Sequence, residues 1–219
     1  MKFYETQFSN KTLFAQCEYI FWDFDGVIKD SVEVKSNAFF KLFEEFGHDI
    51  ALRVRSHHED NGGLSRFEKL PIYLKWAGKK PTEELLSEYC VKFSQLVKQD
   101  VIESKWVPGV LEFIRKNNKK SSFFIITATP QDEIEEIMIE LGIMRYFIEV
   151  IGSPTNKEHA IKKILKKYSI LPNNSIMIGD SYSDLYAANL NYVPFILRRT
   201  KNNKNLQKEL NCPKIYNFI

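Results

Sequence analysis

Two acidic residues stand directly after an apolar stretch near the start of the chain. In "YIFWDFDGVIKDS", residues 19–31, the apolar run ends at Asp23 and Asp25, and Gly26 follows. Burying a carboxylate beside a hydrophobic core costs free energy unless a partner compensates for the lost water. Fold stability alone gives no reason to place two carboxylates there. The pattern therefore indicates chemistry.

Further reactive residue types follow later apolar runs in the same way: Thr127, Lys157, Asp180 and Asp184. In open α/β sheets, ligands bind at the carboxyl ends of the strands, so residues that end separate strands can meet there. Two carboxylates about 4 Å apart repel by roughly 4 kcal/mol at an effective dielectric near 20, so such a cluster needs cations. Mg²⁺ is the expected ion, because it prefers oxygen ligands and binds through carboxylates and phosphate together. With the lysine, such a site would neutralise a phosphate group and stabilise its charge during transfer.

The elements that must position these residues are five short apolar runs, at 19–22, 123–126, 147–151, 176–178 and 195–197. These runs are typical of buried strands. Helical spacing of apolar residues occurs between most of them, at 108–117, 131–141, 157–168 and 183–189. Strands that alternate with helices predict a parallel sheet covered on both faces, which is a doubly wound α/β fold.

The alternation stops between residue 30 and about residue 106. Long amphipathic stretches at 31–46 and 81–103 occur there without a strand-like run. We therefore predict an α/β core formed by residues 1–29 and 107–219, with an all-helical cap domain inserted at 30–106. The length of 219 residues, 44% of them hydrophobic, suits one domain that carries an insertion.

Four of these segments resemble, in order and spacing, the motifs of the haloacid dehalogenase superfamily. They are "DFDGVIKDS", the threonine of "FIITATP", the lysine of "GSPTNKEHA", and "IGDSYSD". The resemblance is to the capped phosphatase and beta-phosphoglucomutase-like branch, and it extends over most of the chain. It implies a Rossmann-like core and phosphoryl transfer, because the dehalogenases of the superfamily lack an aspartate two places after the nucleophile.

The resemblance also implies residue roles. Asp23 would be the nucleophile that forms an aspartyl phosphate, and Asp25 would be the general acid and base. Thr127 and Lys157 would hold phosphate oxygens. Mg²⁺ would be bound by Asp23, Asp180 and the backbone carbonyl of Asp25. Asp184 would orient Lys157 or complete the outer shell of the metal, and Gly26 would allow the sharp turn behind Asp25.

The predicted cap supplies candidate substrate contacts. In "NGGLSRFEKL", residues 61–70, Gly63, Ser65 and Arg66 match a cap loop that reaches the substrate in related phosphatases and mutases, and Lys69 could assist. Lys35 lies about one turn into the first predicted cap helix, where phosphoglucomutase-like relatives carry a histidine. We expect Lys35 to bind a second anionic group of the substrate, with a solvated surface lysine as the alternative.

Other features have simpler interpretations. Thr129 and Pro130 are typical of an N-cap and a first helical position, and we expect His57 and His58 to lie in a loop. The net charge is only +3 and the lysines are dispersed, which does not favour nucleic acid as a partner. The first 14 residues lack a leader pattern, and no apolar run spans a membrane. A cytoplasmic protein, monomeric or dimeric, is expected.

The sequence thus predicts a Mg²⁺-dependent phosphatase that hydrolyses a small phosphorylated metabolite, such as a phosphosugar, through an aspartyl phosphate. Two alternatives stay open at this stage. One is a phosphomutase of the beta-phosphoglucomutase type, and the other is a non-catalytic binding module on the same fold. The binding module is disfavoured because all four charged motif residues are intact: Asp23, Asp25, Lys157 and Asp180.

Overall fold

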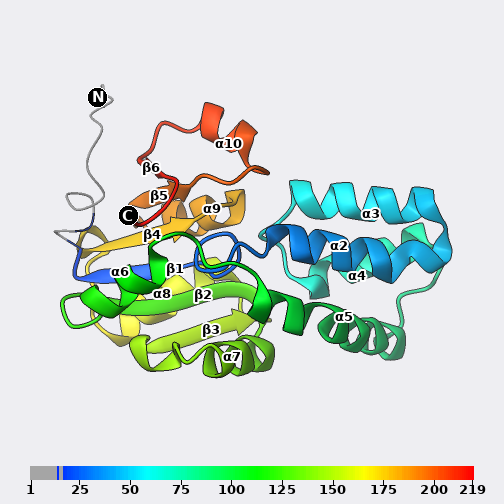
Figure 1. Ribbon diagram of the computed structural model, residues 1–219, viewed down its shortest axis with the longest axis horizontal. Coiled ribbons are helices and arrows are strands. Elements are labelled where there is room, and N and C mark those ends of the chain that lie inside the picture. Colours follow the sequence, from blue (N-terminus) through cyan, green and yellow to red (C-terminus); the bar gives the residue numbers. More distant parts are fainter. Residues whose placement is uncertain (1–13, 15–16) are drawn as a thin grey trace.

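The computed structural model describes residue 14 and residues 17–219. A parallel sheet forms its centre, with strand order β3-β2-β1-β4-β5-β6 (Figure 1). The strands are β1 (Tyr19–Trp22), β2 (Ser122–Pro130), β3 (Glu149–Ser153), β4 (Ser175–Gly179), β5 (Phe195–Arg198) and β6 (Lys214–Ile215). Along the chain, β2 and β3 are added on one side of β1, and β4, β5 and β6 are added on its other side. The predicted doubly wound α/β fold is confirmed.

Alternating side chains of the strands feed two separate hydrophobic clusters, one on each face. Ile20 and Trp22 of β1 belong to one cluster, whereas Phe21 belongs to the other. The first cluster is covered by α6 (Val110–Asn117) and α7 (Gln131–Glu140). The second is covered by α8 (Lys157–Lys167), α9 (Tyr182–Leu190) and α10 (Lys204–Glu209). Burial on both faces explains why the strands are continuous apolar runs.

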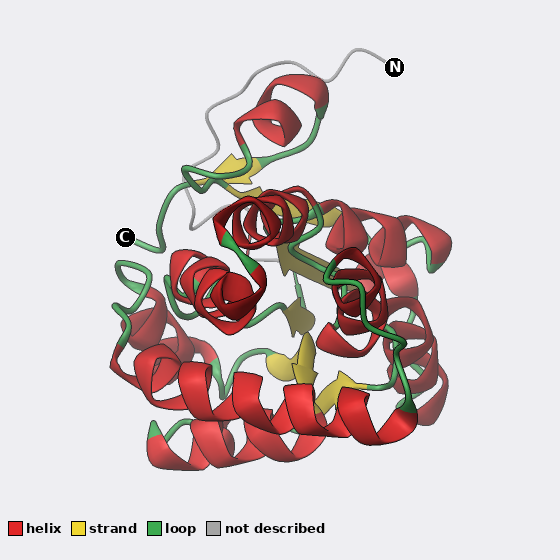
Figure 2. Cartoon of the chain, turned by 90° about the vertical axis from the view of Figure 1, so that its right-hand side faces the viewer, coloured by secondary structure: helices red, strands yellow, loops and turns green. Residues whose placement is uncertain are grey.

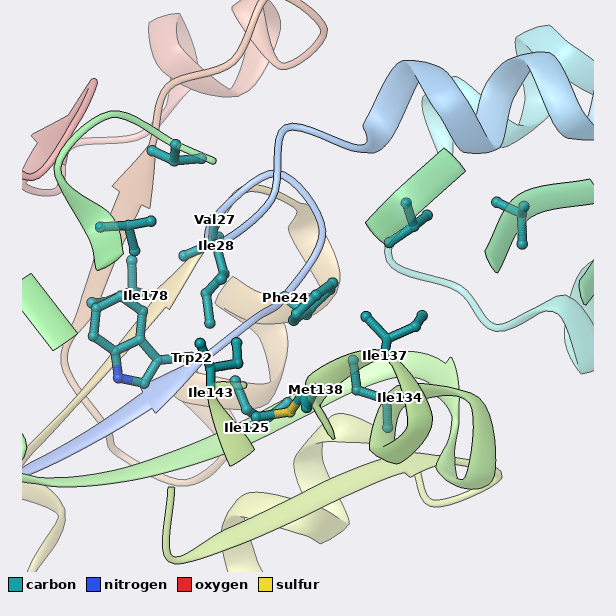
Figure 3. Close-up of a cluster of buried hydrophobic side chains, with 14 of the residues drawn as sticks. Trp22, Phe24, Val27, Ile28, Ile125, Ile134, Ile137, Met138, Ile143 and Ile178 are labelled. Atoms are coloured by element: carbon teal, nitrogen blue, oxygen red, sulfur yellow. The ribbon is translucent and has the colours of Figure 1, made fainter. Parts of the chain in front are cut away.

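Figure 3 shows how the first cluster supports the start of the site. Trp22 packs with Ile125 and Ile178 of the two strands that pair with β1. Phe24 is fully buried in the same cluster, together with Ile134 and Ile137 of α7. Because Phe24 is anchored in the core, the two aspartates that flank it are held at the carboxyl end of β1.

Four helices are inserted between β1 and α6, on one side of the sheet (Figure 1). They are α2 (Val32–Phe43), α3 (His48–Asp60), α4 (Arg66–Trp76) and α5 (Glu83–Glu103). Viewed from this side, the strands lie behind the inserted helices (Figure 2). Short 3₁₀ helices occur at Glu44–Phe46, Met144–Tyr146 and Pro172–Asn174.

The two chain segments that connect the inserted helices to the sheet lie side by side. Lys29 and Trp106 form an isolated antiparallel bridge, and the amide of Asp30 donates to the carbonyl of Lys105 at 2.8 Å. We propose that the division between core and cap lies at these crossings. The predicted core also includes residues 1–13, 15 and 16, which lie outside the described residues.

Some details differ from the sequence predictions. His57 and His58 lie in α3 and not in a loop, and His58 is buried. Thr129 does not cap α7, because β2 continues to Pro130, which itself occupies the N-cap position. The short strand β6 and helix α10 were not predicted. The C-terminal segment docks as expected, with the Phe218 ring 5.3 Å from that of Trp22.

The longest described helix, α5, has 21 residues and carries charges throughout. Across residue 14 and residues 17–219, no helix combines the length and the apolar character that crossing a membrane requires.

Candidate active site

Three carboxylates gather at the carboxyl ends of β1 and β4. Ligand atoms of Asp23, Asp180 and Asp184 all lie within 4.8 Å of one another. Burial, followed by the charge of Asp184, raises the pKa of Asp23 to about 7. Burial, followed by the charge of Asp23, raises the pKa of Asp180 well above its ordinary value. Together with Asp25, these residues are called the acidic floor below.

The floor fits a hard divalent cation. Its donors are carboxylate oxygens, which Mg²⁺ prefers, and burial together with their mutual repulsion raises the pKa values of Asp23 and Asp180. The carboxylate of Asp180 accepts no hydrogen bond from any residue that the structure describes, so its oxygens are available as ligands. Asp184 is less available, because it accepts hydrogen bonds from Ser181 and from the Asp180 amide.

Lys157, the first residue of α8, lies between two floor carboxylates. Its Nζ is 2.9 Å from Oδ2 of Asp23 and 2.6 Å from Oδ1 of Asp184. Burial alone would lower the pKa of this lysine, but the charges of Asp184 and Asp23 raise it above its ordinary value. Lys157 is therefore a fixed positive charge next to Asp23.

Gly26 is required by the geometry of the floor. Its φ of +75° lies in the left-handed region, and a Cβ at this position would lie 2.1 Å from Oδ2 of Asp180. Any larger residue would strain the backbone and displace that carboxylate.

Asp25 is held by a separate network. Its Oδ1 accepts a hydrogen bond of 2.6 Å from Ser31, and its Oδ2 accepts one of 3.1 Å from Thr129. Oδ2 also forms an ion pair with Lys35, whose ammonium lies 2.8 Å from the Thr129 hydroxyl. Burial alone would raise the pKa of Asp25, but the charge of Lys35 and these hydrogen bonds hold it below its ordinary value. Lys35 thus reaches from α2 to the floor.

Thr127, near the end of β2, lines the cavity above the floor and is 1% exposed. Its hydroxyl accepts a 3.2 Å hydrogen bond from the amide of Thr129. This contact fixes the backbone at the end of β2, so the same strand presents both threonines to the site.

The inserted helices cover this floor and leave a cavity of about 660 Å³. Closure is tight at the loop before α4, where a Cβ on Gly63 would lie 1.8 Å from Oγ of Ser183, in the first turn of α9. Three cations from α2 and α4 line the cavity on the cap side: Lys35, Arg66 and Lys69. We call them the basic roof.

Arg66 has a carboxylate partner in the core. Its guanidinium donates to both carboxylate oxygens of Glu133 in α7, at 2.8 and 2.5 Å, and also to Ser94 of α5. The side chains of Arg66 and Glu133 are 4% and 6% exposed, so this ion pair is buried. It connects the cap with the core.

Ser65 has a local role. Its hydroxyl and amide both bond to the carboxylate of Glu68, which forms a capping box at the start of α4. Ser65 does not line the cavity. Eight of the predicted site residues line the cavity: Asp23, Asp25, Lys35, Gly63, Arg66, Thr127, Lys157 and Asp180.

Four residues at this site were absent from the sequence-based prediction or had only a minor role in it: His58, Glu133, Thr129 and Lys69. The first two, one beside Lys69 and the other beside Arg66, became visible only once the helices were packed. For Thr129 a signal was available, because it stands two positions after Thr127 on one strand and therefore shares its face. Lys69 likewise stands three positions after Arg66 on one helix.

Comparison with known proteins identifies the family of this chain. Residues 20–197 match the family described as haloacid dehalogenase-like hydrolase. The chain is 25% identical over 186 residues to a phosphorylated carbohydrates phosphatase of Thermotoga maritima, covering 78% of this chain and 80% of that protein. It is 26% identical over 185 residues to a phosphoglycolate phosphatase of Nitrosococcus oceani, covering 80% and 81%.

A solved structure shows the same fold. Beta-phosphoglucomutase from Clostridium difficile superposes with a TM-score of 0.74 at 22% identity, and the match covers 92% of each chain. The family match spans most of the chain and includes both strand ends that carry the floor, β1 and β4. The chain therefore belongs to the haloacid dehalogenase-like hydrolases.

Proposed function

We propose that this protein is a Mg²⁺-dependent phosphatase that hydrolyses a small phosphorylated metabolite, such as a phosphosugar, through an aspartyl phosphate on Asp23. The observation that carries the proposal is the position of Asp23, which lines the cavity between cap and core with the Lys157 ammonium 2.9 Å from its carboxylate. The relatives named as phosphatases support the type of reaction.

In this mechanism, a carboxylate oxygen of Asp23 attacks phosphorus and displaces the alcohol oxygen. Asp25 must enter this step protonated, which requires that substrate binding weaken its ion pair with Lys35. Asp25 then protonates the leaving oxygen and later takes a proton from the water that cleaves the aspartyl phosphate. Thr127 and Lys157 hold phosphate oxygens, and Lys157 balances the charge that builds up beside Asp23. Asp23, Asp180 and the Asp25 carbonyl would hold Mg²⁺, which would neutralise phosphate charge when bound.

The cap would shield this chemistry from solvent. The Gly63 loop packs against Ser181 and Ser183 at the start of α9, which would restrict the access of water to the phosphate. Lys35 and Thr129 fix the orientation of the Asp25 carboxylate. We keep the cytoplasmic location and the monomeric or dimeric state as predictions from the sequence.

The test is hydrolysis of a panel of phosphate monoesters with Mg²⁺, by the natural protein and by Asp23→Asn. An amide cannot attack phosphorus, so we expect kcat to fall at least about a thousandfold. Asp132→Asn is the matched control, because Asp132 is exposed in the first turn of α7. If Asp23→Asn keeps more than a few per cent of the activity, Asp23 is not the nucleophile.

Product analysis separates hydrolysis from the phosphomutase alternative. We expect hexose 1-phosphate, if it is a substrate at all, to yield inorganic phosphate and free hexose. Faster formation of hexose 6-phosphate than of inorganic phosphate would replace the phosphatase proposal with a phosphomutase. No turnover of any ester in the panel would favour a binding module.

A further inference from the structure

The three cations of the basic roof differ in their partners. Arg66 is neutralised by Glu133, and Lys35 by Asp25. Lys69 lies one turn after Arg66 on α4, lines the same cavity and is 1% exposed. No carboxylate within residue 14 and residues 17–219 forms an ion pair with Lys69. The Lys69 ammonium instead lies 3.0 Å from a ring nitrogen, Nδ1 of His58.

His58 cannot supply the missing negative charge. It is buried in α3, and its ring packs 4.8 Å from the ring of Phe39. Burial, followed by the charge of Lys69, lowers the pKa of His58 well below its ordinary value, so the ring is neutral and accepts a hydrogen bond from the ammonium. His58 therefore orients Lys69 without neutralising it.

This arrangement does not stabilise the fold. A buried ammonium loses its hydration, and only an opposite charge with good geometry compensates for that loss. Burial, followed by the charge of Lys35, lowers the pKa of Lys69 to about 7. An anion placed against Lys69 would offset both effects. A buried cation without a counter-ion at the wall of a cavity is typical of a ligand-binding group.

We propose that Lys69, oriented by His58, binds a second anionic group on the substrate, at the end away from the phosphate that Asp23 attacks. This inference rests on the proposed phosphatase function and narrows its substrate class. The substrate is a compact phosphate ester that carries a second set of anionic oxygens, a carboxylate or another phosphate. Arg66 is then a link between cap and core, and Lys69 is the roof cation that selects the substrate.

The first experiment compares substrates that differ in the second group. 2-Phosphoglycolate is matched with 2-hydroxyethyl phosphate, and glucose 1,6-bisphosphate with glucose 1-phosphate. Lys69→Met should lower kcat/KM for the anionic member of one pair by about 10- to 100-fold more than for its neutral partner, because a charged hydrogen bond is lost. The pair that shows the difference identifies the second group as carboxylate or phosphate.

Lys75→Met is the matched control, because it makes the same substitution at an exposed lysine of the same helix. It should leave kcat/KM unchanged for all four esters. Lys69→Arg retains the charge and should recover part of the lost selectivity. His58→Phe keeps a ring against Phe39 but removes Nδ1. As a change in a positioning residue, it should raise KM for the anionic ester while changing kcat little.

A binding measurement separates this inference from the proposed function. Phosphonoacetate carries a phosphonate and a carboxylate and cannot be hydrolysed as an ester, and propylphosphonate lacks the carboxylate. By calorimetry with Mg²⁺ present, the natural protein should bind phosphonoacetate more tightly, and Lys69→Met should abolish that preference. If no ester is hydrolysed but this preference is found, the phosphatase proposal fails and the anion site stands.

Two results would overturn the inference while the phosphatase proposal survives. One is an equal loss of kcat/KM for charged and neutral esters in Lys69→Met. The other is no change for any ester and no change in phosphonoacetate binding. The melting temperature of Lys69→Met should not fall, because the variant removes a buried ammonium without a counter-ion. A lower melting temperature with equal losses identifies Lys69 as a structural residue.

Discussion

The acidic floor and the basic roof face each other across one cavity, but they are built in different ways. Asp23 and Asp180 follow two adjacent parallel strands, β1 and β4, so the backbone of the sheet sets their distance. The roof cations come from α2 and α4, so their positions depend on how the cap helices pack on one another and on the core. The sheet backbone therefore fixes the positions of the floor carboxylates, whereas helix packing determines the positions of the roof cations.

This difference predicts a division of labour. Changes in the floor should reduce turnover of every phosphate ester, because they affect the reacting phosphate itself. Changes in the roof should depend on the rest of the substrate or on cap closure. A change in the floor that affects only some esters, or a change in the roof that affects all esters equally, would contradict this division.

Metal removal should have the largest effect on the floor. With excess chelator, turnover should fall by at least about a thousandfold for all esters, because several kcal/mol of charge stabilisation are lost. Mg²⁺ should restore turnover, and Ca²⁺ should do so poorly because its coordination is longer and looser. Mg²⁺ should also raise the melting temperature, since it binds the folded state. Full activity in chelator would refute the metal site.

Asp25→Asn should have the next largest effect. The variant cannot protonate the leaving oxygen, so kcat for alkyl phosphates should fall by about a hundredfold or more. For p-nitrophenyl phosphate, whose leaving group needs little protonation, the loss should be clearly smaller. Asp132→Asn again serves as the control. Equal losses for alkyl and aryl esters would contradict the acid role of Asp25.

The floor could be predicted from the sequence because its signals are local. An apolar run followed by Asp23 and Asp25, or by Asp180, marks the end of a buried strand, and parallel strands bring such ends together. The core strands were found for the same reason, and two-residue β6 was missed because so short a strand has no pattern of its own.

The roof could not be predicted in this way. Arg66 looked like the substrate-binding cation, but Glu133, 67 residues later in sequence, neutralises it. Nothing near Lys69 in the sequence shows that His58 lies beside its ammonium. Thr129 was misplaced because its capping pattern is genuine locally, whereas pairing between β2 and β3 extends the strand to Pro130. Tertiary packing decided all three cases.

The buried link between cap and core provides a prediction about stability. Glu133→Gln leaves the Arg66 guanidinium buried without a counter-ion, so unfolding should become easier by about 3 to 5 kcal/mol. Arg66→Met combined with Glu133→Met should recover much of this loss, because both charges are then removed. Denaturant unfolding measures the effect.

A neighbouring ion pair supplies the control. Lys98 of α5 and Glu136 of α7 also join cap and core, at 2.6 Å, but their side chains are 44% and 60% exposed. Glu136→Gln should cost at most about 1 kcal/mol, since water screens the pair. Similar losses for Glu133→Gln and Glu136→Gln would show that burial of the Arg66 link has no special role.

The raised pKa of Asp23 predicts how pH and metal act together. Burial, followed by the charge of Asp184, raises this pKa to about 7, and the nucleophile must be ionised. At limiting Mg²⁺, kcat/KM should therefore decline as pH falls through about 7. Saturating Mg²⁺ should move this decline to lower pH, because the cation favours the carboxylate. If the decline of kcat/KM at low pH is the same at limiting and saturating Mg²⁺, Asp23 does not bind the metal.

The smallest expected effect lies where floor and roof meet, at Thr129. Its hydroxyl donates a hydrogen bond to Asp25 and lies 2.8 Å from the Lys35 ammonium. Thr129 therefore fixes the position of a floor carboxylate relative to a roof cation. Thr129→Val preserves the shape of the side chain but removes the hydroxyl, and kcat should fall by about tenfold or less. Thr129→Ser keeps the hydroxyl, and its kcat should stay close to that of the natural protein.

Because Thr129 acts through Asp25, the loss of kcat in Thr129→Val should again be larger for alkyl than for aryl phosphates. If Thr129→Val instead raises KM only for esters with a second anionic group, Thr129 serves the roof through Lys35 and not the floor through Asp25.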